Sequence, residues 1–315
     1  MAPVPPPGRR LGPSPLRRTW LLLPLLAGIE LVGLATVRAR VPAEADWRGA
    51  AERVREAWRP GDAVVVAPSW AGPLLRHHLG DLLTPSDVGR SDLAGVERLW
   101  ALSIRGHRPE EAPPSSPAVN QAFGRVRVLR WDLPVERVVY DFLAHVEDAR
   151  VTLERGGEER DCPWRAHRSA RGGGLGAGAL VPGARFDCGR PALWVGLTTQ
   201  ETLDLEPRRC IHQRPADPGA LRVTFPDVPL GGRLVLYGGL YSEDERDLEG
   251  APTTTVVRVD GREIGRLVRH DGDGWARMEA ITPGGRADVT VEVSSPNVAR
   301  RSFCWAATTR PAEAR

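Results

Sequence analysis

The sequence predicts a small three-layer α/β domain followed by an all-β sandwich, behind one N-terminal hydrophobic helix. Three observations predict this architecture. An apolar run of 18 residues, 20–37, lies near the start of the chain. Helical and strand patterns alternate over 44–134, whereas 138–309 holds short β-rich stretches separated by Gly and Pro. A Pro/Arg-rich cytoplasmic head, 1–19, and a short tail, 310–315, complete the predicted organisation.

The composition excludes several classes of protein. Of the 315 residues 41% are hydrophobic, 26% charged and 6% aromatic, with 34 Gly and 29 Pro. This is too rich in turn-forming residues for a coiled coil or a helical bundle, and too apolar for a disordered chain. All 43 basic residues are Arg, and six of them lie in 1–40, so the rest of the chain is near neutral. Without a clustered basic face we expect no binding of nucleic acid.

The segment 20–40 is predicted to be a signal anchor or a signal peptide. The run Trp20–Val37 contains one charge, Glu30, and follows four arginines. As a helix it is about 27 Å long, close to the thickness of the hydrocarbon core. The arginines predict a single-pass cell-membrane protein with its bulk in the periplasm. The alternative is cleavage after Ala39 or Ala43 and secretion, and Arg17-Arg18 also resembles a twin-arginine signal.

The cysteines fit an exported protein. Their number is even, and in an oxidising compartment the simplest expectation is two disulfides, for which three pairings exist. We expect the two pairs to be Cys162 with Cys188, and Cys210 with Cys304. A zinc site is the alternative, but there is no C-x-x-C and only His167 and His212 lie near a cysteine, so we predict no metal.

The α/β domain is predicted from five segments. The segments are a helix over 47–58 capped by Asp46, a strand over 62–67, a helix over 74–82, and strands over 96–104 and 125–131. The first helix has apolar residues at i, i+3, i+4 and i+7 and ends at Pro60-Gly61. The strand Asp62–Ala67 is a continuous apolar run typical of a parallel strand. Neither G-x-G-x-x-G nor G-x-x-x-x-G-K-[ST] occurs, so no nucleotide site is indicated.

Several motifs in this domain carry a family resemblance. They are Asp46-Trp47-Arg48-Gly49-Ala50-Ala51, Arg59-Pro60-Gly61-Asp62 before the Val-rich strand, Pro68 before a helix, and Arg98-Leu99-Trp100. They resemble the soluble extracytoplasmic domain of GT-C glycosyltransferases, which use lipid-linked sugars. The resemblance covers 44–134 only, and the many-helix transmembrane catalytic body of that family has no counterpart here. It therefore implies a periplasmic accessory domain and a membrane glycosyltransferase partner, not the transferase activity itself.

The second part reads as a sandwich of short strands. Asp260-Gly261 between two of them predicts a type I′ hairpin turn. This half resembles jelly-roll, galactose-binding-like modules, which implies a glycan ligand. The expected strands are 138–143, 149–153, 192–197, 221–225, 233–237, 254–260, 263–269, 275–280, 287–293 and 302–308.

Three aromatic residues are the candidate ligand-binding residues: Trp70, Tyr241 and Trp275. Their flat faces suit a sugar ring, although Trp and Tyr also serve as core anchors. Tyr237 and Trp305 are further aromatic residues of this kind.

Two acidic segments raise the question of calcium. The run 242–247 and Asp271-Gly272-Asp273-Gly274 offer the oxygen ligands that calcium prefers, but a solvated loop and a plain turn are the favoured interpretations, so we predict no cofactor and keep calcium as the alternative.

An enzyme is a less favoured interpretation of the sequence. Ser69 follows the strand 62–67, where open α/β sheets bind ligands, but it lies outside a G-x-S-x-G motif. His77 and His78 are adjacent on a helix and are expected to point in different directions. We assign no catalytic residue.

The leading hypothesis is therefore an exported envelope protein that acts as a non-catalytic carbohydrate-binding or accessory module of envelope glycan metabolism. A periplasmic hydrolase or glycosyltransferase-related enzyme and a structural envelope scaffold are the alternatives.

Overall fold

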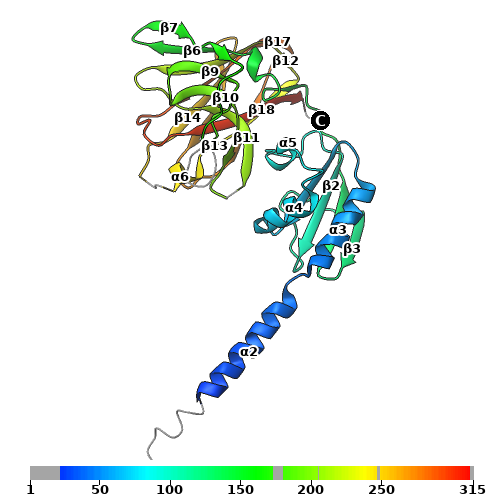
Figure 1. The fold of residues 1–315 in the computed structure, drawn as a ribbon. Coiled ribbons are helices and arrows are strands. Elements are labelled where there is room, and N and C mark those ends of the chain that lie inside the picture. Colours follow the sequence, from blue (N-terminus) through cyan, green and yellow to red (C-terminus); the bar gives the residue numbers. More distant parts are fainter. Residues whose placement is uncertain (1–21, 173–179, 205, 247–248, 313–315) are drawn as a thin grey trace, which may run out of the picture.

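The computed structural model describes residues 22–172, 180–204, 206–246 and 249–312. The first element is the helix α2 (Leu22–Arg40), which extends away from two folded domains (Figure 1). Nine large apolar side chains of α2 are exposed. Within the described ranges no helix is both long and apolar enough to cross a membrane. The head 1–19 and the first two residues of the predicted anchor, 20 and 21, lie outside these ranges.

The first domain is a four-stranded sheet with two helices on one face. β1 (Asp62–Ala67) runs parallel to β2 (Arg98–Ile104), and β4 (Val126–Asp132) is antiparallel to β2 and to the edge strand β3 (Val119–Phe123). The helices are α3 (Glu44–Ala57) and α4 (Gly72–Leu79), and a short helix α5 (Pro85–Val88) follows.

The predicted third layer does not form as helices. The apolar stripes of α3 and α4 both pack on the sheet face that carries Trp100 and Leu102. The opposite face, with Leu99, Ala101 and Trp131, is covered by irregular segments that contribute Leu93, Val96, Ala112 and Leu133. This face buries fewer apolar side chains than the face covered by α3 and α4.

The start of α3 also differs from the prediction. Ala43 is the N-cap, and Asp46 lies in the first turn. The Asp46 carboxylate accepts hydrogen bonds from the Ala43 and Arg125 N–H groups, both at 3.1 Å. From the first turn of α3, Asp46 thus stabilises the start of the helix and, through Arg125, connects α3 to the turn before β4.

The second domain is a β-sandwich, as predicted. One sheet has the order β16-β13-β18-β11-β10-β9-β8, with β5 paired to β18, and the other has the order β15-β14-β17-β12-β6-β7. The strands of the first sheet are β5 (Tyr140–Asp141), β8 (Trp164–Arg165), β9 (Arg185–Arg190), β10 (Leu193–Glu201), β11 (Pro207–Gln213), β13 (Gly232–Leu240), β16 (Ala276–Ile281) and β18 (Phe303–Pro311). Those of the second are β6 (Arg150–Arg155), β7 (Glu158–Asp161), β12 (Ala220–Leu230), β14 (Thr253–Val259), β15 (Arg262–Arg269) and β17 (Gly285–Ser294).

The sandwich core lies between the inner faces of these two sheets. β12 and β17 alternate buried residues with half-buried or exposed ones, as strands with one solvated face do. Phe142, Phe225 and Trp305 meet edge to face at its centre, with ring centroids 4.8–6.3 Å apart. Between β14 and β15, Asp260 and Gly261 have φ values of 47° and 78°, which is the predicted type I′ conformation.

The four cysteines form the two predicted disulfides. Cys162 is bonded to Cys188, and Cys210 on β11 is bonded to Cys304 on the neighbouring strand β18. The alternative zinc site at these residues is therefore wrong.

Candidate functional site

Polar contacts join the two domains. Beside these contacts lie two cavities that share Arg90, and together we call them the cleft. Arg310 on β18 forms ion pairs with Asp92 of the first domain and, at 2.8 Å, with Glu136 of the linker. The Arg209 N–H on β11 donates a 2.7 Å hydrogen bond to the Gly89 carbonyl just after α5. Figure 1 shows α5 beside β11 at this junction. These contacts place the loop 89–92 against the edge of the sandwich.

A cavity of about 350 Å³ lies between the domains, and we call it the interface cavity. Both domains contribute side chains, among them Arg90 and Asp92 from the first, and Asp141, Arg209 and Tyr237 from the second. Burial raises the pKa of the Asp141 carboxyl. Burial, together with the nearby Asp92 carboxylate, raises the pKa of Tyr237 to about 12. At neutral pH the Tyr237 hydroxyl is therefore protonated.

A second cavity of about 330 Å³, the strand-end cavity, lies at the carboxyl end of β1. Ser69, Arg108, Glu111 and Arg208 line it, and Arg90 lines it as well. In an open α/β sheet the carboxyl ends of the strands are where ligands bind, because the loops there diverge. Its lining contains hydrogen-bond donors and acceptors in similar measure.

Two carboxylates just before β11 complete the strand-end cavity. Burial raises the pKa of Glu206. Burial also acts to raise the pKa of Asp204, but hydrogen bonds from Thr202 and Arg208 outweigh it, and the pKa is lowered. Arg208 donates to Asp204 at 2.9 Å and to the Arg90 carbonyl at 3.2 Å. The second domain thereby fixes the backbone of Arg90.

Arg90 is the one residue named above that lines both cavities. Within the described ranges its guanidinium makes one hydrogen bond, a long one of 3.5 Å to the Val64 carbonyl. Burial lowers its pKa, while Asp87 and Glu111 counteract this from outside ion-pair distance. In the described part of the chain no carboxylate forms an ion pair with it. A half-buried guanidinium without a carboxylate is unusual, because buried charges in proteins are normally paired.

Trp70 provides an apolar surface close to the strand-end cavity. It lies in the 3₁₀ turn Ser69–Ala71 that follows β1, and its neighbour Ser69 lines the cavity. The Trp70 side chain is 61% exposed, and the Arg105 guanidinium lies over its ring at 5.9 Å. An exposed indole held by a cation on one side is not a core anchor.

Tyr241 and Trp275, the other two aromatic candidates, lie elsewhere. Both are half-buried in the sandwich and line neither cavity. Tyr241 precedes α6 (Ser242–Glu245), which is well separated from α4 in Figure 1. The Trp275 indole nitrogen is buried without a hydrogen-bond partner. The structure therefore does not bring the three candidates together.

The acidic segments are engaged by donors of the protein itself. The expected solvated loop at 242–247 is helical over α6, and Asp244 and Glu245 are buried. Asp244 accepts a 2.8 Å hydrogen bond from the Ser302 N–H, and Glu245 accepts one from the Gly274 N–H. Asp271 forms a 3.1 Å ion pair with the buried Arg301. These carboxylates hold loops of the sandwich in place.

The structure assembles no nucleophile and base around Ser69. Among the described residues its hydroxyl makes no hydrogen bond, and His77 and His78 do not line the strand-end cavity. Acyl transfer by Ser69 needs a base within hydrogen-bond reach. Arg90, Arg208 and Asp141 were not singled out from the sequence, because single residues in an arginine-rich chain carry no signal.

No family model and no curated protein matches the chain. The solved structures with similarity include carbohydrate-binding modules of family CBM51. One is CBM51-2 with the INT domains of ZmpB from Clostridium perfringens, in complex with GlcNAc: TM-score 0.31, 11% identity, 52% of this chain and 37% of that chain covered. This chain thus spans little more than a third of that structure.

Two more structures are of the same kind. CBM51 from Clostridium perfringens GH95, in complex with methyl-galactose, has a TM-score of 0.28 and 10% identity, covering 36% of this chain and 81% of that chain. The tandem CBM51 modules of Sp3GH98 from Streptococcus pneumoniae have a TM-score of 0.30 and 12% identity, covering 60% of this chain and 54% of that chain. At these TM-scores the similarity supports neither a fold assignment nor a function for this chain.

Proposed function

We propose that the protein is a non-catalytic carbohydrate-binding module and that its ligand is an acidic saccharide bound in the cleft between the domains. The unpaired guanidinium of Arg90 carries this proposal. A sugar carboxylate or phosphate would supply the missing anion, and a planar guanidinium binds either one through two parallel hydrogen bonds. Both cavities open onto Arg90, so a ligand in either one reaches it.

The remaining lining suits the hydroxyl groups of a sugar. Ser69, Arg108 and Arg208 offer donors, and Glu111 and Asp204 offer acceptors. A volume of about 330 Å³ is at the lower end of the range for ligand sites, which fits a short saccharide. The exposed face of Trp70, whose neighbour Ser69 lines the cavity, would stack on a further sugar ring.

We further propose that the folded domains work outside the cytoplasm, in the cell envelope. The two disulfides support this, because disulfides persist in oxidising compartments and are rare in the cytosol. An accessory role in envelope glycan metabolism fits an exported glycan-binding protein. The glycosyltransferase partner suggested by the motifs of 44–134 stays a prediction.

A glycan array probed with the full chain tests the ligand class. We expect saccharides with uronic acid or phosphate groups to bind, and their neutral counterparts to bind at least about tenfold more weakly, since a bidentate charged hydrogen bond contributes on the order of 1.5–3 kcal/mol. Arg90→Gln should abolish this preference. The matched control is Arg262→Gln, which alters an exposed arginine in the hairpin turn. Binding of neutral sugars alone, or acidic binding unchanged in Arg90→Gln, would refute the proposal.

A further inference from the structure

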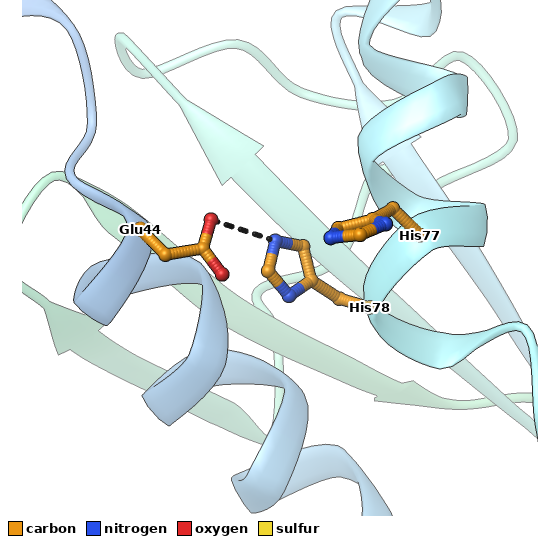
Figure 2. A group of neighbouring side chains, drawn as sticks. All are labelled: Glu44, His77 and His78. Carbon is orange, nitrogen blue, oxygen red and sulfur yellow. Dashed lines mark ion pairs between the residues drawn. The ribbon is translucent and has the colours of Figure 1, made fainter.

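Three side chains of types that can bind a metal ion lie close together outside the cleft, where α3 begins and α4 ends. Glu44 is the first residue of α3, and His77 and His78 lie in the last turn of α4. One ligand atom from each lies within 4.8 Å of the other two. Figure 2 shows the Glu44 carboxylate facing the His78 ring across the gap between the two helices, with the His77 ring beside it. The sequence-based expectation that the two histidines diverge is wrong.

Packing between the two helices explains this convergence. The His78 ring stacks on the buried Trp47 of α3, with an interplanar angle of 6° and centroids 6.1 Å apart. The His77 ring stands nearly perpendicular to His78, at 78° and 4.9 Å. α4 therefore presents His78 toward the start of α3, and His77 remains exposed at the rim of the same gap.

The buried Nε2 atom of His78 has no hydrogen-bond partner among the residues that the structure describes. The residue is only 8% exposed. The Glu44 Oε2 atom lies 3.6 Å from Nε2, which is too far for a hydrogen bond. A buried polar atom left unpaired destabilises the fold, so the arrangement calls for a further partner.

The observed spacing is that of two ligands of one ion. Tetrahedral zinc sites have metal–ligand bonds of about 2.0–2.1 Å, which puts neighbouring ligand atoms about 3.3 Å apart. The 3.6 Å between Glu44 and His78 is close to this value. The exposed side chains of Glu44 and His77 are free to rotate by the small amount needed to close the set around an ion.

The charges around the gap are compatible with metal binding. Arg48 reaches Glu44 at 3.7 Å, but both side chains are exposed, so an ion competes with a weak surface pair.

We propose that Glu44, His77 and His78 bind one divalent transition-metal ion of the zinc class, with water completing the tetrahedron. Two imidazoles and one carboxylate favour zinc over calcium or magnesium, which prefer all-oxygen ligands. The ion would link the start of α3 to the end of α4. This site is separate from the cleft, so its test is independent of glycan binding.

Calorimetric titration of the tag-free full chain with Zn²⁺, after treatment with a chelator, tests the site. We expect one saturable site, and a loss of affinity of about tenfold or more in Glu44→Gln and in His77→Gln, since each removes a ligand. Both residues are exposed, so neither change threatens folding. His270→Gln is the control, because it removes an exposed histidine that also lies beside a carboxylate, Asp273 at 3.4 Å.

Co²⁺ provides a second measurement on the same variants. A tetrahedral site gives intense visible absorption, which should appear with the unaltered chain and His270→Gln, and be lost in His77→Gln. Thermal melting with Zn²⁺ should show a rise in Tm that is lost in Glu44→Gln. The proposal is overturned if no saturable Zn²⁺ binding occurs, or if binding survives in both Glu44→Gln and His77→Gln.

Discussion

Arg310 on the last strand of the sandwich forms an ion pair with Asp92 of the α/β domain, across 218 positions of sequence. Glu136 of the linker binds the same guanidinium. This contact joins the C-terminal strand to the loop that carries Arg90, so the cleft depends on it. The relative position of the two domains is thus determined by residues from three distant parts of the chain.

Breaking this contact should loosen the interface. In Asp92→Ala we expect a loss of about 1.5–3 kcal/mol in the free energy of unfolding, because the buried Arg310 side chain, 4% exposed, loses one of its two carboxylate partners and keeps Glu136. Chemical denaturation measures the change. Arg150→Ala, which removes an exposed ion pair with Asp161, should lower the free energy of unfolding by less than Asp92→Ala does. Equal effects of the two changes would contradict this role of Arg310.

The two disulfides should stabilise the sandwich unequally. Cys210–Cys304 closes a span of 94 residues and Cys162–Cys188 one of 26. In the chain-entropy model these spans correspond to about 4.7 and about 3.5 kcal/mol. Paired Cys→Ala variants, compared by urea denaturation, should therefore rank in that order. The reverse order would show that the loop length does not determine the contribution of each bond.

His212 should make stability fall in acid. It is buried, stacks on Trp194 at 3.9 Å, and burial lowers its pKa to about 4. The unfolded chain takes up a proton near pH 6.5, whereas the folded chain does so only near pH 4. This contribution is therefore fully present above pH 6.5 and is lost as the pH falls to 4, by about 3 kcal/mol in total.

Unfolding titrations at pH 7 and pH 5 test this prediction. His212→Phe, which keeps an aromatic ring stacked on Trp194, should reduce the difference in stability between the two pH values. A pH dependence that persists in His212→Phe would assign it to other groups.

Trp70 should contribute to binding but not to folding. Trp70→Ala should leave the free energy of unfolding within about 0.5 kcal/mol, since the side chain is mostly exposed. It should weaken binding of an acidic oligosaccharide by roughly 1 kcal/mol or more, because a stacking surface is lost. Trp275→Ala, outside both cavities, should leave affinity unchanged. The opposite pattern would place the ligand on the sandwich.

Elements with a clear local pattern could be predicted from the sequence. β1 is a continuous apolar run, and its bounds match the prediction. The Asp260-Gly261 turn follows from backbone sterics alone. β9 and β11 were missed, because Arg and Asp interrupt their apolar residues: in β11, Arg208 and Arg209 face the first domain instead of solvent.

The candidate site was only partly accessible from the sequence. Trp70 could be named from its chemistry and Ser69 from its place after a strand. The importance of Arg90 arises from the docking of the two domains, which no local pattern encodes. The meeting of Glu44 with His77 and His78 likewise depends on how α3 packs on α4.

We propose that Arg90 recognises the negative charge of a saccharide. Calorimetry with an acidic saccharide and its carboxyl-reduced neutral counterpart, each titrated into the unaltered chain and Arg90→Gln, measures this recognition. We expect a preference of about tenfold or more for the acidic ligand in the unaltered chain, and no preference in Arg90→Gln. An acidic preference of the same size in both proteins would refute the role of Arg90.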